Sequence, residues 1–205
     1  MKRILWTVAL AAGLTGPALA DTPVARLMDQ ETRALRAISG DRMASYVARP
    51  EIGIEYSRDW LAQQRVGRLD AEARCLAEAL YFEARGESVR GQFAVAEVIL
   101  NRVDSPAFPD TVCGVIHQGT GRKFQCQFTY TCDGHPDTIA NQTAFEQVSR
   151  VARLMLAGAP RRLTDGATHY HTRAVTPRWS RIYPRTATIG VHHFYRQPTQ
   201  VSQKN

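Results

Sequence analysis

The sequence predicts an α+β fold, with a helical core and a small antiparallel β-sheet beside it. Apolar residues recur at helical spacing over residues 70–103, a stretch long enough for two helices, and again over residues 141–157. Residues 168–172 and 188–195 are short runs rich in β-branched and aromatic residues, which is typical of strands. Helices and strands that occupy separate parts of a chain indicate an α+β domain rather than alternating βαβ units.

Residues 70–84 and 88–103 are expected to form two helices joined by a very short turn. Asp70 and Ser88 precede them, and both residue types favour the N-cap position because their side-chain oxygens accept free backbone N–H groups. Gly86 suits the left-handed conformation that often follows a helix end. The second helix is apolar almost all round, so we expect it to be the buried core of the domain.

The later elements are shorter. Residues 124–130 alternate well enough for a strand or an extended segment. A third helix is expected over residues 141–157, with Gly158 and Pro160 as its stop signals. The two C-terminal runs then supply the strands of the sheet.

Residues 1–20 have the organisation of a secretory signal peptide: a basic start, an apolar run over residues 4–14 and an A-x-A cleavage site ending at Ala20. The run is too short to span a bilayer. We expect export to the periplasm or to the cell exterior and cell wall. No lipobox cysteine lies near Ala20, so we expect no stable membrane anchor.

Three further parts follow the signal peptide. Residues 21–69 are polar and charge-mixed with helical patches, and we interpret them as a partly helical N-terminal extension. Residues 70–196 hold all the predicted core elements and form the main domain. Residues 197–205 are a polar tail.

The charge of the chain limits the class of partner. The formal net charge is +7 at pH 7, but the lysines and arginines are scattered rather than clustered. This distribution and the predicted export argue against a nucleic-acid partner. A basic exported protein is suited to an anionic wall polymer.

Four cysteines in an exported chain favour disulfides over free thiols. Four cysteines allow three pairings, which sequence alone does not decide. Cys126 and Cys132 would close a short loop, so the preferred set pairs them and pairs Cys75 with Cys113. A zinc site built from the four would lack the paired C-x-x-C spacing.

Glu83 is an unusual residue in the first helix. It lies seven positions after Leu76 and three after Leu80, so it shares their inward-facing stripe. Apolar surroundings and the negative end of the helix dipole both favour the protonated carboxyl. A carboxyl that stays protonated near neutrality can act as a general acid. The alternative is an ordinary glutamate bonded to Arg85 or to solvent.

Two other glutamates are weaker catalytic candidates. Glu87 enters the start of the second helix, where acids are common, and is the fallback as a second carboxyl. Glu97 lies on the one polar stripe of that helix, so we expect a structural role for it.

Histidines and aromatic residues form a second group of candidates. His169 and His171 lie two apart in one predicted strand and His192 and His193 lie in its neighbour, so three imidazoles could converge. A zinc amidase would combine such a cluster with a carboxylate base, although no H-E-x-x-H or comparable helical pair is present. We therefore expect no metal ion and no other cofactor. The alternative role of the histidines is hydrogen bonding in a groove or on a polar sheet face.

Side chains suited to sugar binding lie in the loops and the extended segment. Trp179 lies in the loop between the predicted strands, where its ring could stack on the flat face of a ligand. Gln127 and Thr129 add amide and hydroxyl groups of the kind that bind sugars or acetamides.

The run from Ala79 to Val103 resembles the SleB-type cell-wall hydrolases, the family of spore-cortex-lytic enzymes and their relatives in non-spore-formers. Its most specific part is the E-A-R-G-E turn, followed by G-Q-x-A-V-A and N-R-V. The resemblance continues in order to about residue 195. Further matches are F-P at 108–109, T-V-C-G-V at 111–115, C-Q-F-T-Y-T-C-D-G at 126–134, A-T-H-Y-H at 167–171, P-x-W at 177–179 and I-G-x-H-x-F-Y at 189–195.

This resemblance implies a lysozyme-like, transglycosylase-related fold that acts on peptidoglycan glycan strands. In such folds one glutamate at a helix end is the acid and base, and Glu83 matches that position. It would protonate the glycosidic oxygen between N-acetylmuramic acid and N-acetylglucosamine, then accept the proton of the sugar's own C6 hydroxyl to leave a 1,6-anhydro product. The residues expected to line the cleft are Gln127, Thr129, His169, Tyr170 and His171.

Three alternatives stay open at this point. A hydrolase would use water and a partner acid, for which Asp133 and Glu97 are candidates. An N-acetylmuramoyl-L-alanine amidase would release stem peptides and would be sensitive to EDTA. A non-catalytic protein would bind sacculi without releasing any soluble muropeptide.

Overall fold

The computed structural model describes residues 22–36, 53–65, 67–121 and 125–198. The chain divides into two units, Met1–Pro50 and Glu51–Asn205. In the first unit, helix α1 (Thr22–Arg36) carries the exposed apolar side chains of Val24, Leu27 and Met28. The predicted signal peptide and residues 199–205 of the predicted tail lie outside the described residues.

Two helices in the middle of the chain, α4 (Ala71–Ala84) and α5 (Val89–Val103), form the centre of the second unit. The caps are those predicted: Asp70 accepts the N–H of Ala73 across 2.8 Å, and Ser88 accepts the N–H of Gly91 across 3.2 Å. Gly86 does not adopt the left-handed conformation that we expected. Two residues separate the right-handed C-cap at Arg85 from the next N-cap at Ser88, and neither has a positive φ.

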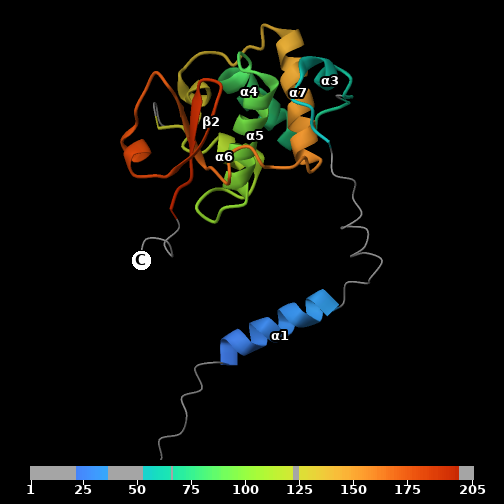
Figure 1. Ribbon diagram of the computed structural model, residues 1–205, viewed down its shortest axis with the longest axis vertical. Coiled ribbons are helices and arrows are strands. Elements are labelled where there is room, and N and C mark those ends of the chain that lie inside the picture. Colours follow the sequence, from blue (N-terminus) through green and yellow to red (C-terminus); the bar gives the residue numbers. More distant parts are fainter. Residues whose placement is uncertain (1–21, 37–52, 66, 122–124, 199–205) are drawn as a thin grey trace, which may run out of the picture. The chain divides into compact units, whose positions relative to one another are not determined.

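Helix α5 is the buried core of the domain, as its composition predicted. Its side chains from Phe93 to Ile99 are at most 1% exposed. Helices α4 and α7 (Gln142–Leu156) pack against it, with α6 (Val112–Ile116) on α4 and α5 (Figure 1). Helix α3 (Arg58–Ala62) packs on α7 and buries Leu61, so part of the predicted extension contacts the core. The predicted boundary at residue 70 stays a prediction.

The sheet has three antiparallel strands in the order β1-β3-β2: β1 (His169–Thr172), β2 (Arg185–Ile189) and β3 (His192–Tyr195). The sequence had indicated one strand over residues 188–195. It is broken at Gly190, which has a φ of +59° and turns the chain between β2 and β3. Such a turn is easy for glycine, which has no Cβ. The helical core with a small antiparallel sheet confirms the α+β prediction.

Residues 125–132 are not a strand. Thr129–Cys132 form a short 3₁₀ helix, η1, after the buried side chain of Phe128. The Oγ1 of Thr131 donates to the carbonyl of Phe128 across 2.9 Å, and this local bond closes the turn. The disulfide Cys126–Cys132 brackets the turn, and Cys75–Cys113 joins the start of α4 to α6, so the structure contains both bridges of the preferred pairing.

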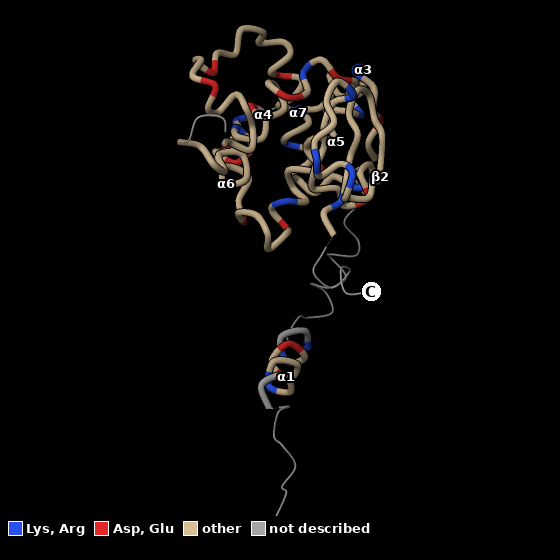
Figure 2. The backbone as a smooth tube through the Cα atoms, turned by 90° about the vertical axis from the view of Figure 1, so that its left-hand side faces the viewer, with Lys and Arg blue, Asp and Glu red and all other residues tan. Residues whose placement is uncertain are grey.

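The charged residues of the second unit are spread along its backbone. Figure 2 shows basic and acidic residues interspersed along the described backbone rather than gathered in one basic stripe. Over the same described residues, no helix combines the length and the apolar character needed to cross a bilayer.

Candidate active site

Glu83 lies in the last turn of α4, on the stripe that also carries the fully buried Leu76 and Leu80. Its side chain is partly buried and faces the sheet. Oε2 of Glu83 accepts a hydrogen bond from the hydroxyl of Tyr170 on β1 across 3.3 Å. The carboxyl therefore lies where the helix end meets the first strand.

The environment of Glu83 favours its protonated form. Burial raises the pKa of this carboxyl above its usual range, and burial is the largest influence. The Tyr170 hydrogen bond and the positive charge of Arg102 act in the opposite direction, because both stabilise the carboxylate. The balance leaves an acid that can give up a proton and can also be held in its ionised form.

Arg102 is a site residue that the sequence reasoning missed. It lies on α5, is 2% exposed, and its Nε donates to the carbonyl of Thr168 across 2.6 Å. Its guanidinium lies over the rings of Phe108 and Phe128, 5.5 and 5.7 Å from their centroids. Burial lowers the pKa of Arg102, while Tyr170 and Glu83 raise it. Its place in the last turn of a helix that is apolar almost all round could have signalled this role.

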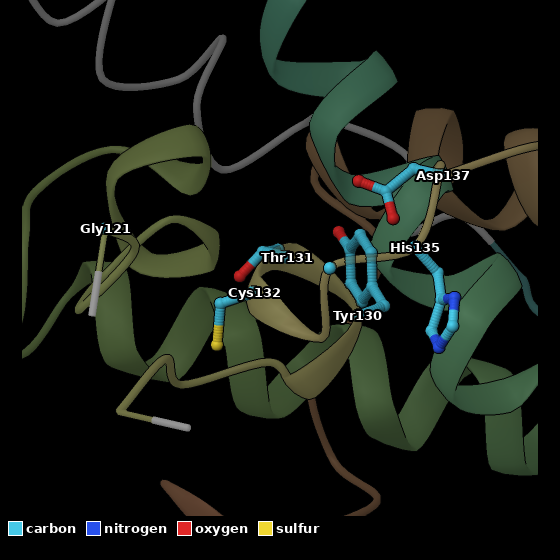
Figure 3. Close-up of a pocket in the computed structure, with 7 residues that line it drawn as sticks. Gly121, Tyr130, Thr131, Cys132, His135 and Asp137 are labelled. Atoms are coloured by element: carbon cyan, nitrogen blue, oxygen red, sulfur yellow. The ribbon is translucent and has the colours of Figure 1, made fainter. Parts of the chain in front are cut away.

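Tyr130 connects η1 to the C-terminal end of α4, which carries Glu83. Its ring stacks on Phe82 with the centroids 4.5 Å apart and the planes 19° from parallel. Burial raises the pKa of its hydroxyl, as do the nearby carboxylates of Glu78, Asp137 and Glu83. A hollow of about 450 Å³ lies beside this ring, and in Figure 3 the hydroxyl end of Tyr130 is turned toward Asp137.

Two of the predicted sugar-binding residues lie on the same segment as Tyr130. Gln127 and Thr129 are exposed and flank the buried Phe128. The backbone N–H of Gln127 donates to the carbonyl of Gln118 across 2.9 Å, which fixes the segment while both side chains stay accessible. Thr129 directly precedes Tyr130, whose ring stacks on Phe82, the residue before Glu83 in the chain.

The predicted residues of β1 divide between the two faces of the sheet. Tyr170 pairs with Phe194, and Thr172 pairs with His192, so these four share the face that meets the helices. His169 and His171 alternate with them and point to the opposite face. The structure therefore brings Tyr170 to Glu83 but turns both of these histidines away from it.

His169, His171 and Trp179 form one cluster on that outer face. The ring of Trp179 lies 5.1 Å from His169 and 5.6 Å from His171, measured between centroids. Nδ1 of His171 lies 2.8 Å from the carbonyl of Thr172, to which only an N–H can donate, and its Nε2 lies 3.0 Å from the hydroxyl of Tyr195. Burial and the charge of Arg102 lower the pKa of His169 to about 4. Both imidazoles are packed side chains, and both ring nitrogens of His171 have a hydrogen-bond partner.

The remaining histidine of interest, His192, faces inward and meets Glu87. Its Nδ1 lies 3.5 Å from Oε1 of Glu87, and the side chains are 4% and 10% exposed, respectively. Burial lowers the pKa of His192, and Glu87 opposes that shift. His192 lies on the opposite face from His169 and His171, whereas His193 pairs with His171 on their face, with the ring centroids 5.5 Å apart. Among the described residues, no three His, Cys, Asp or Glu side chains are grouped to hold a metal ion.

The two acids considered as partners of a catalytic glutamate have other roles. Glu97 is 1% exposed and accepts the backbone N–H groups of Leu163 and Thr164, each at 2.9 Å, as well as the Thr164 hydroxyl. Asp133 accepts the backbone N–H of His135 across 2.8 Å in a turn. Glu97 thus ties a loop to α5, as its place on the polar stripe suggested.

Comparison with known proteins gives consistent relatives. The spore cortex-lytic enzyme of Halalkalibacterium halodurans is 38% identical over 129 residues, which cover 62% of this chain and 36% of that protein. The enzyme of the same name from Bacillus subtilis is 47% identical over 77 residues, which cover 38% of this chain and 23% of that protein. The chain therefore spans about a third or less of the length of these two relatives.

A solved structure is also similar in sequence. The catalytic domain of the germination-specific lytic transglycosylase SleB from Bacillus anthracis is 35% identical, with a TM-score of 0.48. The match covers 63% of this chain and 98% of that one.

The family model described as cell wall hydrolase matches residues 86–195. This range contains Glu87, Arg102, the whole sheet and η1, and it begins three residues after Glu83. The matched range is more than half of the 205 residues, and the protein therefore belongs to the cell wall hydrolase family.

Proposed function

We propose that the protein cleaves the glycosidic bond between N-acetylmuramic acid and N-acetylglucosamine in peptidoglycan, as a lytic transglycosylase with Glu83 as its acid and base. The observation that carries the proposal is the carboxyl of Glu83, partly buried at a helix end, with a raised pKa and one hydroxyl donor on Oε2. Membership of the cell wall hydrolase family and relatives that are named spore cortex-lytic enzymes support the choice of substrate.

The first step uses the protonated form of Glu83. The carboxyl gives its proton to the glycosidic oxygen while the bond from that oxygen to C1 of the muramic acid breaks. Positive charge develops at C1 and the ring oxygen as the leaving sugar departs. The carboxylate that remains is stabilised by the Tyr170 hydroxyl and by the charge of Arg102.

The second step uses the ionised form of the same residue. Glu83 removes the proton from the C6 hydroxyl of the muramic acid, whose oxygen then bonds to C1 and gives the 1,6-anhydro product. No water is consumed, and Glu83 ends the cycle protonated again. A single carboxyl whose two charge states are both supported is suited to this sequence.

The surroundings of the other acids favour this pathway over hydrolysis with two carboxylates. Glu87 lies against His192, Glu97 is bonded to three donors of a loop, and Asp133 is part of a turn. A second carboxylate that activates water would need to face the sugar from a free position. None of these three acids is in such an arrangement.

The glycan would be held by residues on both sides of Glu83. We assign sugar contacts to the exposed Gln127 and Thr129 beside the Phe82 and Tyr130 stack. Of the β1 residues, Tyr170 orients Glu83. The cluster of His169, His171 and Trp179 lies on the far side of the strand, so the Trp179 ring would stack on a part of the glycan away from Glu83.

The place of action follows from the substrate. We propose that residues 1–20 are removed as a signal peptide and that the enzyme acts in the periplasm or in the cell wall. N-terminal sequencing of the protein recovered from cells should then begin at Asp21.

The test of the reaction is mass spectrometry of the soluble products that purified peptidoglycan releases. Wild type should release 1,6-anhydro muropeptides, and Glu83→Gln should release none because the amide cannot transfer the proton. Glu146→Gln on α7 is a matched control. Glu146 is 62% exposed, and its carboxylate lies 3.7 Å from Arg150, so the product yield of this variant should equal that of wild type.

Other products would contradict the proposal in distinct ways. Reducing-end sugars would indicate a hydrolase, and free stem peptides would indicate an amidase. Binding to sacculi without release of any muropeptide would indicate a non-catalytic wall protein. Full activity of Glu83→Gln would overturn the assignment of the acid.

A further inference from the structure

Glu83, in the last turn of α4, and Glu87, just before α5, each contact a different strand on the same face of the sheet. Glu83 accepts the hydroxyl of Tyr170 on β1 across 3.3 Å. Four residues later, Oε1 of Glu87 lies 3.5 Å from Nδ1 of His192 on β3. Because β1 and β3 are hydrogen-bonded neighbours, these two contacts lie side by side.

The two contacts meet through the rings of Tyr170 and His192. Their centroids are 5.2 Å apart and their planes are nearly perpendicular, at 89°, so the edge of one ring packs on the face of the other. Phe194 closes the group from behind, 6.0 Å from the ring of Tyr170. The direction of the Tyr170 hydroxyl is therefore determined in part by where His192 lies.

The carboxylate of Glu87 is closely confined. A Cβ on Gly190, in the turn between β2 and β3, would lie 1.9 Å from Oε2 of Glu87, far inside van der Waals contact. A Cβ on Gly91, in the first turn of α5, would lie 3.0 Å from the same oxygen. Two glycines thus leave just enough space for this side chain, and the confined carboxylate has little freedom to reach a substrate.

His192 needs that carboxylate. Its side chain is 4% exposed, and its Nδ1 makes no hydrogen bond with any other described residue. A buried ring nitrogen without a partner is costly, so the charge of Glu87 at 3.5 Å is what compensates it. The other groups that act on this ring are Tyr170 and the imidazole of His171.

We propose that Glu87 and His192 form a positioning pair that fixes the ring of Tyr170 and, through it, the carboxyl of Glu83. The inference rests on the proposed function of Glu83. It gives Glu87 a role different from that of a second catalytic acid: it touches neither sugar nor proton, and it acts through His192.

The pair is expected to influence both the rate and its pH dependence. The group it acts on, Glu83, faces Tyr170 from β1, Arg102 from α5 and Tyr130 from η1. If His192 shifts, the Tyr170 hydroxyl no longer points at Glu83, and the Glu83 carboxylate loses a hydrogen-bond donor. The protonated form then persists to higher pH, and the ionised form needed in the second step becomes less favourable.

The experiment measures turnover at saturating soluble glycan, KM and the pH–rate profile for Glu87→Gln, His192→Phe and the double variant. Glu87→Gln should lower turnover about fivefold to tenfold, leave KM within about twofold, and move the alkaline limb of the profile to higher pH. His192→Phe keeps the ring edge against Tyr170 and leaves the Glu87 carboxylate without its imidazole partner. It should stay within about threefold of wild type.

The double variant decides between positioning and catalysis. If Glu87 acts through His192, removing Glu87 should cost nothing more once Phe replaces the histidine, so the double variant should match His192→Phe. It also removes both the buried carboxylate and the buried imidazole of the pair, and it therefore carries the test even if Glu87→Gln alone fails to fold. An inactive but folded double variant would overturn the proposal and make Glu87 catalytic.

The same assay separates this inference from the proposed function. Wild-type turnover with an unshifted alkaline limb in Glu87→Gln, beside an inactive Glu83→Gln, overturns the positioning pair alone. Activity in Glu83→Gln overturns the proposed function, and the positioning inference falls with it. Glu146→Gln is again the matched control, with an unchanged profile.

Discussion

The hydroxyl of Tyr170 donates to Oε2 of Glu83 across 3.3 Å and so joins the first strand to the last turn of α4. These residues are 87 positions apart in the chain. The contact couples the proposed acid to the sheet, and through the sheet to His192 and Glu87. It also provides the most direct way to change the acidity of Glu83 without removing it.

Tyr170→Phe should slow turnover by about tenfold or more, because a hydrogen bond to a charged carboxylate is lost while the ring is kept. The bond stabilises the ionised form, so its loss raises the pKa of Glu83 further and should move the alkaline limb of the pH–rate profile to higher pH. KM should change little. The measurement is initial rate against pH, and an alkaline limb that moves to lower pH would contradict the assignment of the donor.

Glu83→Gln should stabilise the folded protein at neutral pH although it abolishes activity. Burial raises the pKa of Glu83 above its unfolded value, so ionising the group costs folding free energy. That cost is absent below the unfolded pKa and grows as the pH rises through the folded pKa. The amide has no such cost.

Thermal unfolding of the two proteins in parallel tests this point. At pH 7 the variant should melt about 3 °C higher than wild type, which corresponds to roughly 1 kcal/mol for a chain of this size. Near pH 4 the two should melt together. A variant that is less stable than wild type at pH 7 would show that the carboxylate contributes to the stability of the fold.

Local signals explain why much of the helical core could be predicted. The caps at Asp70 and Ser88 depend on side chains that bond within three residues, and the burial of α5 depends on an apolar pattern inside one helix. The apolar stripe of α4 that carries Glu83 is likewise visible in the sequence, because its residues recur at helical spacing. Each of these features is contained in a short stretch of sequence.

The features that were missed depend on contacts between distant segments. Strand β2 begins with Arg185 and Thr186 and shows little alternation, so its pairing with β3 was not visible locally. The separation of Tyr170 from His169 and His171 depends on which face of β1 the helices cover. The partnership of Glu87 with His192 likewise requires the turn at Gly190 to close on α5.

Arg102 offers a test of the buried positive charge beside the site. Arg102→Met should destabilise the fold by about 2 kcal/mol, because the carbonyl of Thr168 loses its donor in a buried place. It should also raise the pKa of Glu83 and that of His169, since Arg102 lowers both. The alkaline limb of the rate profile should therefore move upward, as in Tyr170→Phe.

Arg102→Lys is the matched comparison. Lysine keeps the charge but lacks the planar group that lies between Phe108 and Phe128, so it should restore the pH profile more than the stability. Urea unfolding and the pH–rate profile separate the two effects. If the pH–rate profile of Arg102→Lys matched that of Arg102→Met, the positive charge of Arg102 would not be what lowers the pKa of Glu83.

Glu97→Gln should separate a structural glutamate from a catalytic one. Oε1 of Glu97 accepts both the N–H and the hydroxyl of Thr164, and Oε2 accepts the N–H of Leu163. In glutamine, an NH₂ group replaces one of the two accepting oxygens. That NH₂ would face a backbone N–H or the hydroxyl, and the buried N–H or hydroxyl would be left without an acceptor. The expected cost is about 2–4 kcal/mol in urea unfolding, from one lost charged hydrogen bond and one unpaired donor. The folded fraction should nevertheless release anhydro muropeptides at the wild-type rate, because Glu97 binds Leu163 and Thr164, whereas the donor to Glu83 is Tyr170. A folded but inactive Glu97→Gln would instead place this carboxyl in the reaction and favour the two-acid mechanism.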